Sequence, residues 1–186
     1  MSMLQHRLDS LAINSETYFN RLASEFLKLG GSGKSVLGFF SGGGGLDLGF
    51  SAAGFDLKLS SDVVEEYCST LEQNLPDHLA FEIDVSDFDK KKIHNIFGDQ
   101  GPHGIIGGPP CQSFSILGSR GATQDPRGAL VYNYMQIIGD LQPEFFLFEN
   151  VPGLKSVNGG EDWHQILKAF GDITGFKIYN TKARYF

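Results

Sequence analysis

The sequence has few cysteines, few basic residues and no long apolar run. It contains two cysteines in 186 residues, too few for the disulfide framework of a small secreted domain, and their spacing fits no zinc-ligand pattern. No stretch approaches the roughly 18 consecutive apolar residues of a membrane-spanning helix. The first residues also lack the apolar core and cleavage site of a secretory signal. These absences predict a cytoplasmic protein (nuclear if eukaryotic), with no metal and no membrane contact.

Basic residues are outnumbered by acidic ones. The 15 lysines and arginines stand against 22 aspartates and glutamates, which gives a formal net charge of −7. Such a chain repels phosphate as a whole, so binding to nucleic acid would need local positive charge or a second polypeptide. The hydrophobic fraction of 41% and the charged fraction of 20% are those of ordinary globular proteins, which disfavours disorder. The length corresponds to about one domain.

Apolar runs typical of buried strands alternate along the chain with stretches typical of helices. The predicted strands are residues 36–40, 55–61, 79–83, 104–107, 145–148 and 176–185. The predicted helices are residues 46–53, 63–74, 127–141 and 163–170. Strands that alternate with helices indicate an α/β fold, here a Rossmann-like, mostly parallel sheet with helices on both faces.

The N-terminal part has a different character. Residues 15–29 carry apolar side chains at three-to-four spacing, which predicts an amphipathic helix with Asn14 or Ser15 as its N-cap. A glycine-rich segment with the composition of a flexible linker follows. The sequence therefore divides into a helix and linker over residues 1–34 and an α/β domain over residues 35–186.

Residues suited to ligand binding follow several predicted strands. Four glycines (residues 42–45) follow the first strand, Asp62 and Asp84 follow the next two, and Cys111 and Glu149 follow two later ones. Because ligands of parallel sheets bind at the carboxyl ends of the strands, we expect these residues to share one rim. The glycines suit close approach of a nucleotide-like ligand, and Asp62 suits a ribose hydroxyl. A glycine-rich turn without a ligand is the structural alternative.

Two of these residues suit covalent chemistry. Cys111 follows two prolines that fix the backbone direction, and a strand-end turn can both expose a thiol and activate it as a nucleophile. Cys68, inside a predicted helix, is expected to be a small buried side chain. Glu149 ends an intensely apolar strand, which predicts partial desolvation and a role as a proton or hydrogen-bond donor. A cap or turn glutamate is the alternative. No histidine lies in a recognisable motif, which disfavours a cysteine protease.

Three segments together resemble the C5-cytosine DNA methyltransferases. The family pattern is Phe-x-Gly-x-Gly-Gly, Pro-Cys-Gln-x-Phe-Ser and Glu-Asn-Val, and the three occur here in that order at residues 40–45, 110–115 and 149–151. Residues 125–128, Asp-Pro-Arg-Gly, are similar to the family's Asp-x-Arg-Gly segment. The resemblance covers most of residues 36–186.

The resemblance implies methyl transfer from S-adenosylmethionine to C5 of cytosine in double-stranded DNA, without a metal. Cys111 would add to C6 of a base flipped out of the duplex, and Glu149 would hold or protonate N3. The implied cofactor-binding residues are Phe40, Ser41, Gly42, Gly44, Gly45, Asp62, Val63, Asp84, Val85, Pro110 and Leu130. The implied substrate- or DNA-binding residues are Gln112, Ser113, Ser115, Arg127 and Asn150.

The sequence also departs from the family pattern. No arginine-rich motif or target-recognition domain follows, which predicts a truncated or split enzyme that needs a second polypeptide. Position 63 is valine, where many relatives have an aromatic ring. Residues 13–15 resemble the family's final Gly-Asn-Ser-like cofactor loop without its glycine. If that loop has moved to the front, Asn14 and Ser15 contact the cofactor; otherwise the following helix only packs on the sheet.

Two other classes of function stay open. One is a methyltransferase-like subunit that binds cofactor or a partner protein without turnover. The other is a small-molecule methyltransferase that uses the same cofactor face. The second class would not require the Pro-Cys-Gln and Glu-Asn-Val segments together, so it is the weaker of the two.

Overall fold

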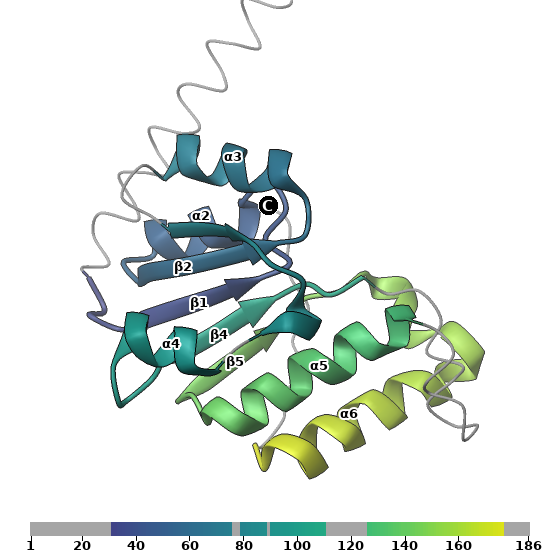
Figure 1. The fold of residues 1–186 in the computed structure, drawn as a ribbon. Helices are drawn as coiled ribbons and strands as arrows, with labels where there is room; N and C mark the ends of the chain where they lie inside the picture. Colours follow the sequence, from purple (N-terminus) through teal and green to yellow (C-terminus); the bar gives the residue numbers. More distant parts are fainter. Residues whose placement is uncertain (1–30, 76–78, 89, 111–125, 177–186) are drawn as a thin grey trace, which may run out of the picture.

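The structure, a computed structural model, describes residues 31–75, 79–88, 90–110 and 126–176. In this part of the chain, five parallel strands form one sheet in the order β3-β2-β1-β4-β5 (Figure 1). The strands are β1 (Ser35–Phe39), β2 (Asp56–Asp62), β3 (Leu79–Glu82), β4 (Gly104–Gly107) and β5 (Phe145–Phe148). The α-helices are α2 (Gly45–Ala52), α3 (Glu65–Asn74), α4 (Lys90–Phe97), α5 (Pro126–Leu141) and α6 (Glu161–Thr174). Short 3-10 helices are η1 (Val85–Asp87), η2 (Pro152–Lys155) and η3 (Val157–Gly160).

Helices cover both faces of the sheet, as the alternating pattern predicted. Figure 1 shows α2 and α3 on one side and α4, α5 and α6 on the other. The chain builds β1, β2 and β3 outward in one direction and then returns to place β4 on the other side of β1. Such a reversal of strand order opens a crevice at the carboxyl ends of the two central strands, where open α/β sheets bind their ligands.

The register brings the strand ends to one level. Phe39, the last residue of β1, pairs with Ser61 of β2 on one side and with Gly107 of β4 on the other. Gly107 in turn pairs with Phe148, the last residue of β5. The segments that follow these strands therefore start from the same edge of the sheet, which we call the carboxyl rim.

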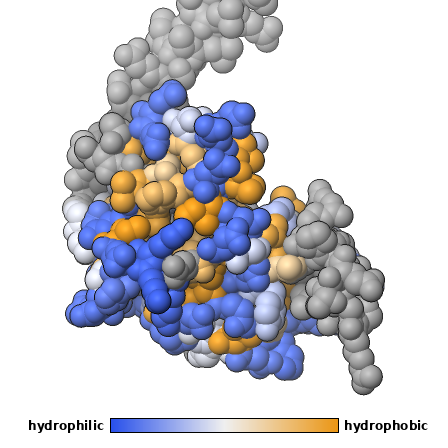
Figure 2. All heavy atoms as spheres, in the orientation of Figure 1, coloured by the Kyte–Doolittle hydropathy of each residue, from blue (hydrophilic) through white to orange (hydrophobic). Residues whose placement is uncertain are grey.

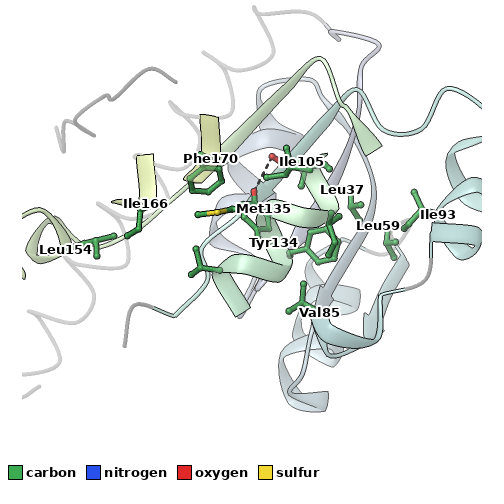
Figure 3. Close-up of a cluster of buried hydrophobic side chains, with 14 residues drawn as sticks. Leu37, Leu59, Val85, Ile93, Ile105, Tyr134, Met135, Leu154, Ile166 and Phe170 are labelled. Carbon is green, nitrogen blue, oxygen red and sulfur yellow. Dashed lines mark hydrogen bonds between the residues drawn. The ribbon is translucent and has the colours of Figure 1, made fainter. Parts of the chain in front are cut away.

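The core lies between the sheet and helices α4, α5 and α6 (Figure 3). Tyr134 of α5 is fully buried there, and its hydroxyl donates a hydrogen bond to the Leu147 carbonyl at 2.7 Å. Phe170 of α6 stacks on Phe146 of β5 with ring centroids 5.1 Å apart. Burial raises the pKa of Tyr134 well above its ordinary value. These aromatic contacts join α5 and α6 to β5 beneath the carboxyl rim.

The predicted elements within the described residues are observed with shifts at their ends. The helix predicted over residues 163–170 extends over Glu161–Thr174. Helix α4 was not predicted, because three consecutive lysines at its start hide a short apolar stripe around Ile93. The predicted N-terminal helix and, apart from Phe176, the predicted strand over residues 176–185 lie outside the described residues.

The surface in Figure 2 is mainly hydrophilic, with apolar side chains gathered near the edge strand β3. Leu79 and Phe81 of this strand are 49% and 39% exposed. Among the described helices, none combines the length and the apolar character needed to span a lipid bilayer.

Candidate functional site

The glycine cluster after β1 forms a turn with unusual backbone angles. The φ angle is +55° at Phe40, +53° at Gly42 and +85° at Gly44. Glycine is required at position 44 for two reasons. The backbone there is left-handed, and a Cβ would lie 2.6 Å from Leu71 Cδ2. A Cβ placed on Gly42, Gly43 or Gly45 would meet no heavy atom within 4 Å. The turn therefore presents backbone that a ligand can approach closely.

Asp62, at the end of β2, holds this turn. Its Oδ2 accepts a hydrogen bond from the Gly42 amide at 2.9 Å, and its Oδ1 accepts one from the Val64 amide at 3.1 Å. The same carboxylate therefore fixes the turn and the approach to α3. A carboxylate has about four lone-pair sites, so both oxygens can also accept hydroxyl groups of a ligand. Val63, beside it, is 60% exposed.

The segment after β3 contributes Asp84 and Val85. Asp84 caps η1, since its Oδ1 accepts a hydrogen bond from the Ser86 amide at 2.8 Å. Asp84 is half-buried, whereas Val85 is 6% exposed and belongs to the core cluster. Leu130, at the start of α5, is half-buried against the same cluster. Of these three residues, Asp84 is therefore the one that can offer a polar side chain to a ligand.

The ends of β4 and β5 are joined by hydrogen bonds. The Glu149 amide donates to the Gly107 carbonyl at 2.9 Å, and Asn150 Nδ2 donates to the Pro109 carbonyl at 2.9 Å. Pro109 is buried and Pro110 is exposed. The segment that leads to Cys111 is therefore fixed against the Glu-Asn pair up to its last described residue.

Glu149 lies close to the β4 strand end. A Cβ on Gly108 would lie 3.0 Å from Glu149 Oε2, so glycine at this position leaves room for the carboxylate. The predicted desolvation of Glu149 is wrong: the side chain is exposed. The physical reason is that β5 is itself only half-buried and that Glu149 continues past its end, away from the core.

Several predicted site residues lie outside the described residues. These are Asn14, Ser15, Cys111, Gln112, Ser113 and Ser115. Arg127 belongs to α5, but its side chain is not described. The structure thus brings together the residues from Phe40 to Gly45 with Asp62 and, from the other strands, Asp84, Pro110, Glu149 and Asn150 at the carboxyl rim.

Cys68 is buried, as predicted. Its side chain is 6% exposed, and Sγ lies 3.8 Å from the Asp62 carbonyl oxygen. Desolvation raises the pKa of this thiol, which makes Cys68 a poor nucleophile. Among the described residues, no group of three or more His, Cys, Asp or Glu side chains is arranged to hold a metal ion.

Sequence reasoning missed Asp47. This residue lies in the first turn of α2, is 1% exposed and accepts hydrogen bonds from the hydroxyls of Ser41 and Ser60. The available signal was a single acidic residue within the otherwise apolar segment 46–53. A charged residue in such a segment must either face water or find internal donors.

Comparison with known proteins places these residues in a family. A family model described as C-5 cytosine-specific DNA methylase matches residues 35–183. Type II methyltransferase M.FnuDI of Fusobacterium nucleatum is 42% identical over 146 residues, which are 77% of this chain and 40% of that protein. Type II methyltransferase M.AquIA of a Picosynechococcus strain is 35% identical over 140 residues, which are 72% of this chain and 55% of that protein. The chain thus spans about two fifths to just over half of the length of these relatives.

Solved structures show the same fold. A crystal structure described as a DNA modification methyltransferase encoded within an E. coli prophage has a TM-score of 0.60 and 35% identity, and covers 73% of this chain and 37% of its own. The S. pombe Dnmt2 methyltransferase has a TM-score of 0.54 and 23% identity, covers 73% of this chain and 40% of its own, and supports the fold alone. Taken with the match over residues 35–183, these findings show that the chain belongs to the C-5 cytosine-specific DNA methylase family.

Proposed function

We propose that this chain carries the cofactor-binding and catalytic part of a DNA (cytosine-5)-methyltransferase. The proposal rests on one observation. Two carboxylates lie at the carboxyl rim, on opposite sides of the central strand pair β1 and β4. Asp62 is bonded to the glycine turn, and Glu149 lies against the strand end that leads to Cys111. The arrangement provides one acidic group for a cofactor and another for a base, in a family whose relatives are named methyltransferases.

The described residues fit S-adenosylmethionine. The open space at the glycine turn allows the cofactor to approach the backbone, and Asp62 has free lone pairs for the ribose hydroxyls. Asp84 would accept a hydrogen bond from the adenine amino group, and Phe40, Pro110 and Leu130 would flank the cofactor. When bound, the cofactor supplies an electrophilic methyl group on a sulfonium sulfur. The chain's own residues bind and orient it.

The base is activated by Cys111 and Glu149. The Cys111 thiolate forms a bond to C6 of cytosine, which moves electron density to C5, and Glu149 donates a proton or hydrogen bond to N3. C5 would then take the methyl group as its bond to the sulfonium sulfur breaks, which would leave the thioether S-adenosylhomocysteine. Loss of the C5 proton to solvent or a base would break the sulfur–C6 bond, return the thiolate and give any proton on N3 back to Glu149. The bond from Asn150 to the Pro109 carbonyl holds the segments of the two catalytic residues together.

Other parts of the proposal rest on the sequence. We propose a helix and linker over residues 1–34, in which Asn14 and Ser15 would complete the cofactor site in a permuted order. Gln112, Ser113, Ser115 and Arg127 contact double-stranded DNA, from which the target cytosine is flipped. Because the 186 residues carry a net charge of −7, which repels phosphate, we propose that a second polypeptide supplies target recognition and most of the phosphate contacts.

Cofactor binding tests the first part of the proposal. Isothermal titration of the full chain with S-adenosylhomocysteine should give one site, and Asp62→Asn should weaken it about tenfold or more, the equivalent of about 1.4 kcal/mol. Glu144→Gln is the matched control, since Glu144 is an exposed acid beside Lys34 at the opposite edge of the sheet. Equal loss in both variants, or no binding by the unaltered chain, would contradict the assignment.

Methyl transfer tests the second part. Tritium transfer from labelled S-adenosylmethionine to duplex DNA, measured with a family member's target-recognition polypeptide added, should disappear in Cys111→Ser and persist in Cys68→Ala. Activity that survives Cys111→Ser would overturn the covalent mechanism. Cofactor binding without any methyl transfer would favour the non-catalytic subunit.

A further inference from the structure

We propose that Asp47 is the positioning residue of the cofactor turn, acting through Ser41; this inference rests on the proposed function. Asp47 is 1% exposed, and in the described part of the chain only Asp162 is a comparably buried charged residue. Burying a carboxylate costs free energy unless donors satisfy it. A carboxylate buried at this position is therefore expected to have a role that offsets the free-energy cost of its burial.

The donors come from two other segments. Asp47 Oδ1 accepts a hydrogen bond from Ser41 Oγ at 2.9 Å and another from Ser60 Oγ. Ser41 belongs to the turn after β1, Ser60 to the buried middle of β2, and Asp47 to α2. One carboxylate oxygen thus joins a turn, a strand and a helix.

The meeting point is closely packed. It lies over Gly38 of β1, where a Cβ would be 2.4 Å from Asp47 Oδ1, 2.9 Å from Ser60 Oγ and 3.0 Å from Ser41 Oγ. No side chain larger than glycine fits at position 38 without displacing this cluster. Glycine at position 38 of β1 therefore leaves the space that the buried carboxylate of Asp47 occupies.

The bond to Ser41 acts on the turn directly. The Ser41 amide donates to the Ser61 carbonyl at 3.2 Å, and the Ser41 carbonyl accepts from the Gly44 amide at 2.9 Å. With its hydroxyl held by Asp47, Ser41 is fixed at three points. The next residue, Gly42, donates its amide to Asp62. Through Ser41, Asp47 therefore sets the orientation of the Gly42 backbone, whose amide is bonded to Asp62, the proposed acceptor for the ribose hydroxyls.

A carboxylate suits this task better than its amide. It accepts both hydroxyls and has no donor of its own, whereas asparagine would bring an NH₂ group into the buried cluster. Its negative charge also lies in the first turn of α2, where the helix dipole favours it. Because Asp47 is buried, it contacts no cofactor atom itself, and its effect on binding passes through Ser41.

Two kinds of variant separate positioning from general stability. Ser41→Ala removes the bond between Asp47 and the turn, whereas Ser60→Ala removes the other bond to the same oxygen and leaves the turn bonded. For the full chain, titration with S-adenosylhomocysteine should show a five- to tenfold weaker Kd in Ser41→Ala and Asp47→Ala, and less than a twofold change in Ser60→Ala. All three variants should lower the melting temperature. Combining Ser41→Ala with Asp47→Ala should weaken binding no further than Asp47→Ala alone.

The Val64 amide, which donates to the same Asp62 carboxylate as the Gly42 amide, supplies a second readout. In a ¹H–¹⁵N spectrum without ligand, its cross-peak should move in Ser41→Ala and keep its position in Ser60→Ala, because only the first variant releases the turn. The spectrum does not depend on folding of Asp47→Ala, so failure of that variant to fold leaves the test intact. An unchanged Kd in Ser41→Ala, or an equal loss of affinity in Ser60→Ala, would overturn the positioning role. Absence of binding by the unaltered chain would instead overturn the proposed function.

Discussion

The Gly42 amide donates a hydrogen bond to the Asp62 carboxylate at 2.9 Å, which joins the turn after β1 to the end of β2. The two residues are 20 positions apart in the sequence, yet they meet because β1 and β2 are parallel neighbours in register. Two adjacent strand ends are thereby held as one unit. The cofactor site that we propose is built on this unit.

Two glycine substitutions in this turn should affect different properties, one the stability of the fold and the other cofactor binding. Gly44→Ala should destabilise the fold by about 1–3 kcal/mol, because the backbone at position 44 is left-handed and the new Cβ would collide with Leu71. Gly43→Ala meets no neighbour within 4 Å, so the free energy of unfolding should change by less than about 0.5 kcal/mol. It should nevertheless weaken cofactor binding, because the methyl group enters the space that the ligand needs. Urea unfolding and calorimetric titration measure the two effects, and a Gly43→Ala variant with unchanged affinity would place the ligand elsewhere.

Gly108→Ala should affect catalysis more than cofactor binding. The added Cβ would lie 3.0 Å from Glu149 Oε2 and would displace the carboxylate that we assign to the base. We expect methyl transfer to fall about tenfold, equivalent to about 1.4 kcal/mol in transition-state stabilisation, with the cofactor Kd unchanged. Gly153→Ala, where a Cβ meets nothing within 4 Å, is the matched control. Equal rates in the two variants would argue against a catalytic Glu149.

Tyr134 should make stability decrease in alkaline solution. Burial raises its pKa in the folded state, so the neutral phenol is retained while an unfolded chain ionises near its ordinary pKa of about 10. This contribution to stability is present below that pKa and is lost as the pH rises through and above it. Tyr134→Phe should cost about 1 kcal/mol at neutral pH through loss of the bond to Leu147 and should flatten this alkaline decline. Tyr132→Phe, at a 47% exposed site, should alter neither property in urea unfolding between pH 8 and 11.

The two cysteines should differ in reactivity. Cys68 is buried and its thiol pKa is raised, so a maleimide should modify it only as fast as the fold opens. Cys111, as a proposed nucleophile, should react in the native state. Mass spectrometry of the modified peptides at pH 7.5 measures both rates. Faster modification of Cys68 than of Cys111 would contradict the assignment of the nucleophile.

The fold was predictable because its signals are local. Short apolar runs ending in glycine or an acidic residue predicted β1, β2 and β4 together with the polar residues at their ends. Helix α4 was missed, since its lysine run masks an apolar stripe that only packing against the core reveals. Strand order is also a tertiary property and could not be read from spacing.

The accessible residues of the proposed site could be selected from the sequence, but the buried residues that support them could not. Asp62 and Glu149 stand out because they follow apolar strands. Asp47 does not, because its partners Ser41 and Ser60 are ordinary polar residues until the fold brings them together. The exposure of Glu149 could not be predicted either. An apolar run indicates a buried strand, but it does not indicate whether the side chain that follows the strand is buried or exposed.

The central claim is that the carboxyl rim binds the cofactor, and a ¹H–¹⁵N titration of the full chain with S-adenosylhomocysteine tests it most directly. We predict shifts in the amide signals of Gly42, Asp62 and Asp84, with the signals of Ser35, His103 and Glu144 at the opposite edge unchanged. Shifts confined to the opposite edge, or no shifts at saturating ligand, would contradict the claim.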